Sequence, residues 1–167
     1  MPLADQVAGL KALGAKFPEM DLDRAGIFGW SFGGYFSAMA VMREPDVFKV
    51  GVAGAPVADW LDYDTHYTER YMGLPEANAD GYAKSSVLTY AKDLRRPLLI
   101  VHGTADDNVY FSQALKMSDA LLRAGRPHEF LPLAGATHMV RDPQMTDRLY
   151  TRIMAYLAAE LGKPAAR

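Results

Sequence analysis

The strongest chemical signal in the sequence is a serine set among glycines. Residues 29–34 read GWSFGG, a G-x-S-x-G pattern between a predicted strand and a predicted helix. There Ser31 would occupy a tight turn that projects its hydroxyl above the sheet, and we expect a side chain at position 29 or 33 to collide with neighbouring backbone. The following helix would point its first amides at developing negative charge, so the Phe32 N–H is a candidate oxyanion donor. A Gly-rich turn with a solvent-facing serine is the alternative, but the position between strand and helix favours a nucleophile.

A serine nucleophile needs a base and an acid that orients the base. On sheets of this kind the acid, Asp or Glu, follows the serine in the chain, and the histidine comes last. Residues 103–108 (GTADDN) leave a strongly apolar segment with two adjacent carboxylates, Asp106 and Asp107, and residues 134–138 (AGATH) end in His138. Functional groups of open α/β sheets gather at the carboxyl edge, so these are the predicted partners of the serine. The residues alone do not choose between the two aspartates.

The remaining histidines fit a catalytic role less well. His128 begins its predicted strand at the opposite end, His66 lies in a long polar segment, and His102 is expected inside the sheet. Taken singly, His138 could be a loop histidine and Asp106 a turn residue. Their order and spacing together carry the prediction.

Four aromatic residues follow one another at intervals of three, four and four: Trp60, Tyr63, Tyr67 and Tyr71. A helix there would present them on one face, and a packing face is the commoner explanation of such a stripe. The stripe follows the second predicted strand at the same sheet edge as Ser31, which favours a pocket wall. Aromatic rings suit a flat apolar ring such as that of proline, which has no side-chain donor to satisfy.

The elements that position these groups alternate between helix and strand along the chain. This order predicts an α/β fold with a mainly parallel sheet and flanking helices. The predicted strands cover residues 24–29, 48–53, 97–102 and 128–133, and the predicted helices cover 3–15, the segment from the serine to about 43, 111–124 and the segment after 142. The first strand is expected to be short and buried, and a long, mostly polar segment runs over 57–95.

The last helix has clear boundary signals. Asp142 is the predicted N-cap, and Pro143 stands at the first helical position. Gly162 and Pro164 are predicted to end it. One apolar face is expected to carry Met145, Leu149, Ile153 and Leu157.

Composition excludes several classes of protein. The chain has 167 residues, a length that suits one domain with a full core. It carries 18 Lys+Arg and 20 Asp+Glu, a net charge of −2, which argues against a nucleic-acid partner. The absence of Cys excludes disulfides, thiolate nucleophiles and Cys-ligated metal. No apolar run approaches the roughly 18 residues that span a bilayer, and no signal-like block opens the chain. We expect neither a metal nor an organic cofactor, and the compartment, cytosol or periplasm, stays open.

Three blocks of the sequence resemble a known family. Residues 29–35 (GWSFGGY), 67–75 (YTERYMGLP) and 102–109 (HGTADDNV) resemble the catalytic domain of the prolyl oligopeptidase family of serine peptidases, and most closely its dipeptidyl peptidase IV branch. The resemblance covers about residues 20–160. It implies an α/β-hydrolase fold and a serine peptidase that cleaves after proline through an acyl-enzyme.

The resemblance also implies roles for single residues. Ser31 would be the nucleophile, Asp106 the triad acid and His138 the general base. Asn108 matches the asparagine that hydrogen-bonds a substrate carbonyl in that branch. The apolar pocket for the proline ring would be built by Phe32, Val57, Trp60, Tyr63, Tyr67 and Val109. Close members carry tyrosine where this chain has Phe32, which keeps the ring surface and the backbone amide.

Parts of the family's machinery have no match in the sequence. We count four predicted strands, whereas the usual α/β-hydrolase sheet has about eight. The second oxyanion donor, which the resemblance implies to be a tyrosine hydroxyl from an early loop, has no match before Leu22. We therefore expect residues 1–167 to form a single, partial catalytic domain, the C-terminal part of a larger peptidase, with an unpaired apolar edge at 24–29. The expected partners are a peptide substrate, the N-terminal part of the same protein and a second copy of the chain.

Two rival functions stay open. An esterase or acylaminoacyl peptidase of the same fold would use the same triad. A catalytically incomplete fragment would act only as a folding or interaction piece. The choice between dipeptide release, tripeptide release and endopeptidase action is also open, because the residues that would make this choice are expected in the N-terminal part of the larger peptidase.

Overall fold

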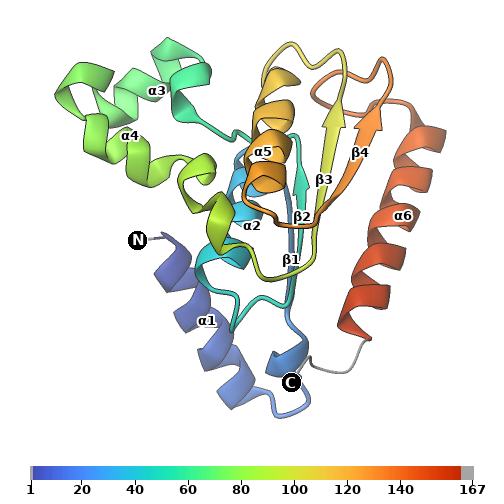
Figure 1. Cartoon of the computed structure of the whole chain (residues 1–167). Coiled ribbons are helices and arrows are strands. Elements are labelled where there is room, and N and C mark those ends of the chain that lie inside the picture. Colours follow the sequence, from blue (N-terminus) through green and yellow to red (C-terminus); the bar gives the residue numbers. More distant parts are fainter. Residues whose placement is uncertain (1, 163–167) are drawn as a thin grey trace.

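The computed structural model describes residues 2–162, which form a four-stranded parallel sheet with helices on both faces (Figure 1). The strands β1 (Gly26–Trp30), β2 (Val50–Gly54), β3 (Leu98–Gly103) and β4 (Glu129–Leu133) lie side by side in chain order. The predicted α/β class with a parallel sheet is therefore confirmed. Because all the strands run the same way, their carboxyl ends meet at one edge of the sheet.

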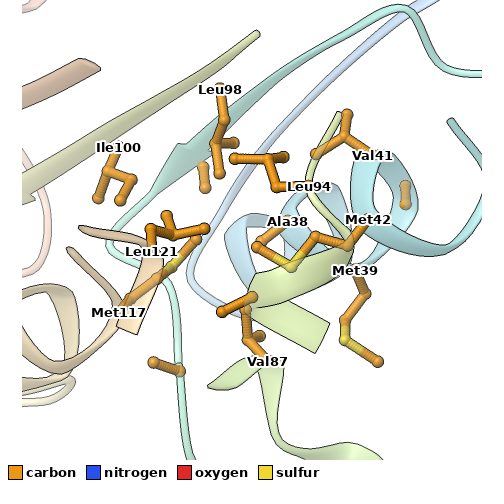
Figure 2. Close-up of a cluster of buried hydrophobic side chains, with 14 of the residues drawn as sticks. Ala38, Met39, Val41, Met42, Val87, Leu94, Leu98, Ile100, Met117 and Leu121 are labelled. Atoms are coloured by element: carbon orange, nitrogen blue, oxygen red, sulfur yellow. The ribbon is translucent and has the colours of Figure 1, made fainter. Parts of the chain in front are cut away.

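Helices cover the two faces of the sheet unequally. Helices α1 (Pro2–Lys16), α2 (Phe32–Arg43) and α5 (Ser112–Arg123) lie on one face, and of the described helices α6 (Pro143–Leu161) alone covers the other (Figure 1). Figure 2 shows the larger core, where the sheet residues Leu98 and Ile100 meet α2 and α5. The central strands β2 and β3 are buried along their whole length. The loop that carries Asp106 therefore leaves a fully buried strand, β3.

Strand β1 differs from its prediction in burial. It begins at Gly26 rather than at Arg24 and pairs, within the described residues, with β2 alone. Phe28 is 37% exposed and meets Tyr150 of α6 edge to face at 6.0 Å between ring centroids. The expectation of a buried strand was wrong, because an edge strand has a neighbour on one side only. The expectation of an unpaired apolar edge holds for the part of the chain that the structure describes.

The segment 57–95 is helical rather than a plain polar loop. It contains the α-helices α3 (Thr65–Met72) and α4 (Ala79–Ser85), and the 3-10 helices η2 (Trp60–Asp62), η3 (Pro75–Ala77) and η4 (Val87–Asp93). In Figure 1, α3 and α4 lie on the α5 side of the sheet, beyond α5. A small core of Val57, Trp60, Tyr82 and Val109 holds the segment against the loop after β3.

The last helix follows its boundary signals. The Asp142 carboxylate accepts the Met145 N–H at 2.7 Å, Pro143 is the first helical residue, and Gly162 is the C-cap. The predicted Pro164 lies outside the described residues. The buried face consists of Leu149, Ile153 and Tyr156, with Leu157 partly buried. Met145 is 40% exposed, so it does not belong to the buried face predicted for it.

Candidate active site

Ser31 lies in a strained turn between β1 and α2. Its backbone has φ 59° and ψ −118°, a left-handed conformation that a non-glycine residue rarely adopts. The Ser31 N–H donates to the Gly54 carbonyl at 2.8 Å, which ties the turn to β2. Although Ser31 stands at the N-cap of α2, its side chain makes no capping bond. The hydroxyl is therefore directed away from the helix and toward the loop after β4.

Three glycines lie near Ser31, at positions 29, 33 and 34, and two of them have no room for a side chain. A Cβ on Gly29 would lie 2.4 Å from the Gly33 carbonyl carbon, so the expected collision at position 29 is confirmed. A Cβ on Gly33 would meet nothing within 4 Å, so the expected collision there was wrong. The confined residue is Gly34, where a Cβ would lie 2.2 Å from the Gly54 carbonyl oxygen. Helix α2 crosses close to β2 at Gly34, whereas a side chain at Gly33 would point into open space.

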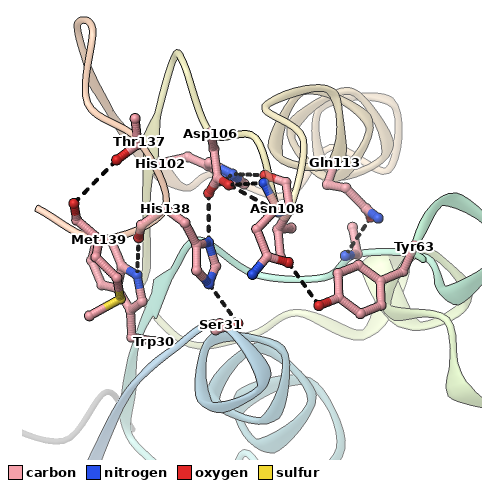
Figure 3. A network of polar contacts seen from close by, with 12 residues as sticks. Trp30, Ser31, Tyr63, His102, Asp106, Asn108, Gln113, Thr137, His138 and Met139 are labelled. Atoms are coloured by element: carbon pink, nitrogen blue, oxygen red, sulfur yellow. Dashed lines mark hydrogen bonds and ion pairs between the residues drawn. The ribbon is translucent and has the colours of Figure 1, made fainter. Parts of the chain in front are cut away.

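Three predicted site residues form one chain of hydrogen bonds (Figure 3). His138 Nε2 lies 2.9 Å from Ser31 Oγ, and His138 Nδ1 lies 2.8 Å from Asp106 Oδ2. A carboxylate only accepts hydrogen bonds, so the imidazole proton belongs on Nδ1 and Nε2 is free to accept from the serine hydroxyl. Each residue comes from the end of a different strand: Ser31 after β1, Asp106 after β3 and His138 after β4. This is the geometry of a base held between an acid and a nucleophile.

Of the two adjacent aspartates, the structure turns only Asp106 inward. Its side chain is fully buried, and Oδ1 accepts the backbone N–H groups of Asn108 and Val109 at 3.0 and 2.9 Å. Asp107 is exposed. The choice that the residues left open thus depends on the turn after β3, which folds back over the first carboxylate.

The Phe32 N–H opens helix α2, where the first amides have no acceptor within the helix. Such amides carry the positive end of the helix dipole. Because Phe32 directly follows Ser31, its amide lies beside the hydroxyl that would attack a substrate. This position suits an oxyanion that forms next to Ser31 Oγ.

The aromatic stripe forms a cluster of rings, but not on one helix face. Trp60 lies on η2, whereas Tyr67 and Tyr71 lie on α3, which begins where Asp64 Oδ1 accepts the Tyr67 N–H at 2.9 Å. No single helix carries the whole stripe, because the Asp64 cap starts a new helix in the middle of it. The rings of Trp60 and Tyr67 nevertheless stack at 6.0 Å and 20°, and Tyr63 meets both edge to face.

The predicted pocket residues fall into two groups. Phe32 and Tyr67 expose 48% and 40% of their surface, so their rings are open to solvent. Val57 and Val109 are 2% and 0% exposed and pack behind Trp60. A cavity of about 430 Å³ shares Phe32, Trp60 and Tyr67 with the predicted pocket. It extends away from Ser31 along α1 and α2, and no other predicted pocket residue lines it.

Asn108 is held by Tyr63. The Tyr63 hydroxyl donates to Asn108 Oδ1 at 2.8 Å, which leaves the Asn108 amide nitrogen to donate elsewhere (Figure 3). Burial, and then the nearby Asp64, raises the pKa of Tyr63 above its usual value, so the phenol stays protonated at neutral pH. The pair joins the aromatic cluster to the loop that carries Asp106.

Three residues that the sequence analysis did not select also shape the site. Trp30 Nε1 donates to the His138 carbonyl at 2.7 Å and so anchors the histidine loop. His102 Nε2 lies 3.2 Å from Asp106 Oδ2. Gln113 is fully buried, and its Oε1 accepts the N–H groups of Ala58 and Asp59, at the start of the aromatic segment. Trp30 and His102 stand inside the recognised motifs, whereas no spacing singles out Gln113.

The described residues lack the features of two other kinds of site. Between residues 2 and 162, no three or more His, Asp or Glu side chains are grouped so as to hold a metal ion. None of the helices in that part of the chain is long and apolar enough to cross a membrane.

The parallel sheet, the strained serine turn and the groups at the strand ends define an α/β-hydrolase fold. The model of the prolyl oligopeptidase family matches residues 1–164, and the chain belongs to this peptidase family. The chain is 42% identical over 165 residues to dipeptidyl peptidase 8 of Homo sapiens, covering 97% of this chain and 18% of that protein. Over 156 residues it is 38% identical to dipeptidyl peptidase 4 of Bos taurus, covering 92% of this chain and 20% of the relative.

A solved structure gives the same assignment. The crystal structure of Porphyromonas gingivalis dipeptidyl peptidase 4 matches with a TM-score of 0.89 and 41% identity, over 95% of this chain and 22% of that one. The chain thus spans about a fifth of the length of these relatives.

Proposed function

We propose that the protein is a serine peptidase that cleaves peptide bonds after proline through an acyl-enzyme on Ser31. The observation that carries the proposal is the hydrogen-bond chain from Ser31 Oγ through His138 to Asp106 Oδ2, at 2.9 and 2.8 Å. His138 Nε2 takes the hydroxyl proton as Ser31 attacks the scissile carbonyl, and Asp106 stabilises the imidazolium that forms. The Phe32 N–H binds the developing oxyanion.

The second half of the reaction uses the same groups. His138 gives its proton to the leaving amine, and the new N-terminus departs. Water then attacks the acyl-enzyme while His138 acts again as base, which releases the acid and restores the Ser31 hydroxyl. No step calls for a metal or an organic cofactor.

Selectivity for proline is proposed from the aromatic cluster. Phe32, Trp60, Tyr63 and Tyr67 offer flat apolar surfaces beside the serine turn, and a proline ring brings no donor that would need a partner. Val57 and Val109 support the Trp60 ring from behind. With its oxygen bound by Tyr63, Asn108 has an amide N–H to donate to a substrate carbonyl.

We also propose that residues 1–167 form one part of a larger catalytic domain. The open side of β1 in the described structure, together with the greater length of the relatives, supports pairing with strands from elsewhere in the protein. A second oxyanion donor would come from that part. The loss of one such donor lowers rates by about 10²–10³-fold, so the chain alone is expected to be slow.

Covalent labelling tests the proposal. A fluorophosphonate probe is expected to label the chain at Ser31, because the probe needs only an activated serine and one working oxyanion donor. Ser31→Ala should abolish labelling, and Ser37→Ala is a matched control because the Ser37 hydroxyl donates to Gly33 O in α2, away from His138. Labelling that persists in Ser31→Ala would contradict the assignment.

Substrate comparison separates the rival function. Joined to the rest of its protein, the chain is expected to hydrolyse Gly-Pro amides faster than simple acyl esters of similar leaving group. An esterase would show the opposite order while still being labelled at Ser31.

A further inference from the structure

A second histidine contacts the acid of the proposed triad from inside the sheet. His102 belongs to β3 and is fully buried, and its Nε2 lies 3.2 Å from Asp106 Oδ2 and 2.8 Å from the Val109 carbonyl oxygen (Figure 3). Both neighbours of Nε2 are acceptors. The proton of the neutral ring therefore belongs on Nε2, which bonds the Val109 carbonyl and lies within reach of the Asp106 carboxylate.

The other ring nitrogen of His102 is left without a hydrogen-bond partner among the described residues. This atom, Nδ1, is buried. Buried polar atoms without partners are rare in native proteins, and they call for a compensating role. An apolar residue would fill the same space with no unpaired atom. The Nε2 donor is the one thing that the imidazole adds.

The carboxylate it meets is held on every side by donors. Asp106 Oδ1 accepts two backbone N–H groups, Oδ2 accepts from His138 Nδ1, and His102 Nε2 lies 3.2 Å from the same oxygen. The charged or titratable groups that face His102 are Asp106 and His138, and on its other side the Phe111 ring meets it edge to face at 5.8 Å. Burial lowers the pKa of His102, so the ring is a neutral donor at neutral pH.

We propose that His102 is a positioning residue for the proposed triad: its buried Nε2–H fixes Asp106 Oδ2 in the plane that His138 needs and shares the negative charge of that oxygen. The effect of this contact on catalysis rests on the proposed function. With the donor removed, Asp106 keeps its two backbone bonds but can tilt, and more of its charge acts on protonated His138. This stronger attraction should raise the pH at which labelling reaches half its maximal rate.

The test uses the whole chain and the substitutions His102→Leu and His102→Gln. In the leucine variant we expect the maximal fluorophosphonate labelling rate to fall about tenfold, the change that corresponds to one hydrogen bond to a charged group, and the half-maximal pH to rise. Glutamine carries an amide donor on a side chain of similar reach, so His102→Gln should restore both. His128→Gln is the matched control, since that histidine bonds Ser118 and Arg126 at the far edge of the sheet and should leave both readouts unchanged.

A second readout does not depend on labelling. In ¹⁵N-labelled wild-type chain, His102 should carry its proton on Nε2 at pH 7, and the His138 Nδ1–H resonance should move in His102→Leu but not in His102→Gln. A proton on His102 Nδ1 would overturn the proposal, even if the leucine variant fails to fold. So would a folded leucine variant that matches the wild type, or a folded glutamine variant that falls as far as leucine. If the wild-type chain does not label, the proposed function fails for this chain, while the resonances still decide the role of His102.

Discussion

Gly33 and Gly34 are neighbours in the sequence, but only at Gly34 would an added Cβ meet another element. Its Cα lies against the Gly54 carbonyl, the same oxygen that accepts the Ser31 N–H. One carbonyl group therefore sets both the depth of α2 and the position of the serine. The geometry around Ser31 therefore depends on the position of a single backbone carbonyl, that of Gly54.

This difference predicts opposite effects of the same substitution. Gly34→Ala should lower the free energy of unfolding by about 1–3 kcal/mol, because a Cβ 2.2 Å from an oxygen forces the backbone to shift. Gly33→Ala should raise it by up to about 1 kcal/mol, since alanine favours a helix and has room there. Urea unfolding of both variants measures the two values. Equal destabilisation would show that the packing of α2 on β2 is not the cause.

The residues proposed for the chemistry were predictable from type and spacing, and their supports were not. Ser31, Asp106 and His138 stand at strand ends that periodicity locates, and the structure brings them within hydrogen-bond distance. Choosing Asp106 over Asp107 required the family resemblance, because only the folded turn shows which carboxylate faces inward. The bonds of Trp30 and Gln113 reach across 108 and 54–55 positions of sequence, where no local pattern points.

Among the elements, β1 carries the largest mismatch between sequence and structure. Its apolar residues predict burial, but its place at the side of the sheet leaves Phe28 37% exposed. The apolar pattern of a strand predicts that it is buried, whereas its position in the sheet determines how much of it is covered by neighbouring strands. The same limit applies to the aromatic stripe, whose spacing suits one helix although the Asp64 cap divides it.

The open side of β1 predicts concentration-dependent self-association of the isolated chain. Phe28→Lys should reduce it, because a charge beside an edge strand opposes further pairing. The variant also loses the contact with Tyr150, which costs about 0.5–1.5 kcal/mol. Sedimentation velocity over a range of concentrations measures the association.

Leu122→Lys is the control for the edge. Leu122 is 74% exposed and lies on α5, away from β1, so a lysine there should leave association unchanged. If both lysines act alike, general surface charge and not the strand edge governs association. A wild-type chain that stays monomeric at every concentration would contradict the prediction.

Across the whole molecule, a buried histidine in the central sheet links stability to pH. Burial lowers the pKa of His102 below its ordinary value of 6.5, although Val109 and Asp106 oppose the shift. The unfolded chain therefore binds a proton at His102 near pH 6.5, and the folded chain binds it only at lower pH. Between these two values the unfolded state holds more protons, so the stability contributed by neutral His102 is lost as pH falls.

We expect the free energy of unfolding to decline on acidification below about pH 6.5. The decline should be shallower in His102→Gln, whose side chain does not titrate. His66→Gln, at an exposed position on α3, should keep the wild-type slope. Urea titrations at a series of pH values measure the slopes, and equal slopes in all three proteins would exclude His102 as the cause.

The segment between β2 and β3 has a consequence for how such a protein can change. The groups proposed for bond cleavage stand on the ends of β1, β3 and β4, whereas Trp60, Tyr63 and Tyr67 all belong to the helical segment 57–95. Phe32, Asn108 and Val109 are the points where the two sets meet. Substitutions within 57–95 would therefore alter the surface proposed to bind the proline ring and leave the groups proposed for the reaction on their strands. On this proposal, substrate preference and reaction depend on separate stretches of the sequence, and changes in the first stretch alone would suffice to alter the preference.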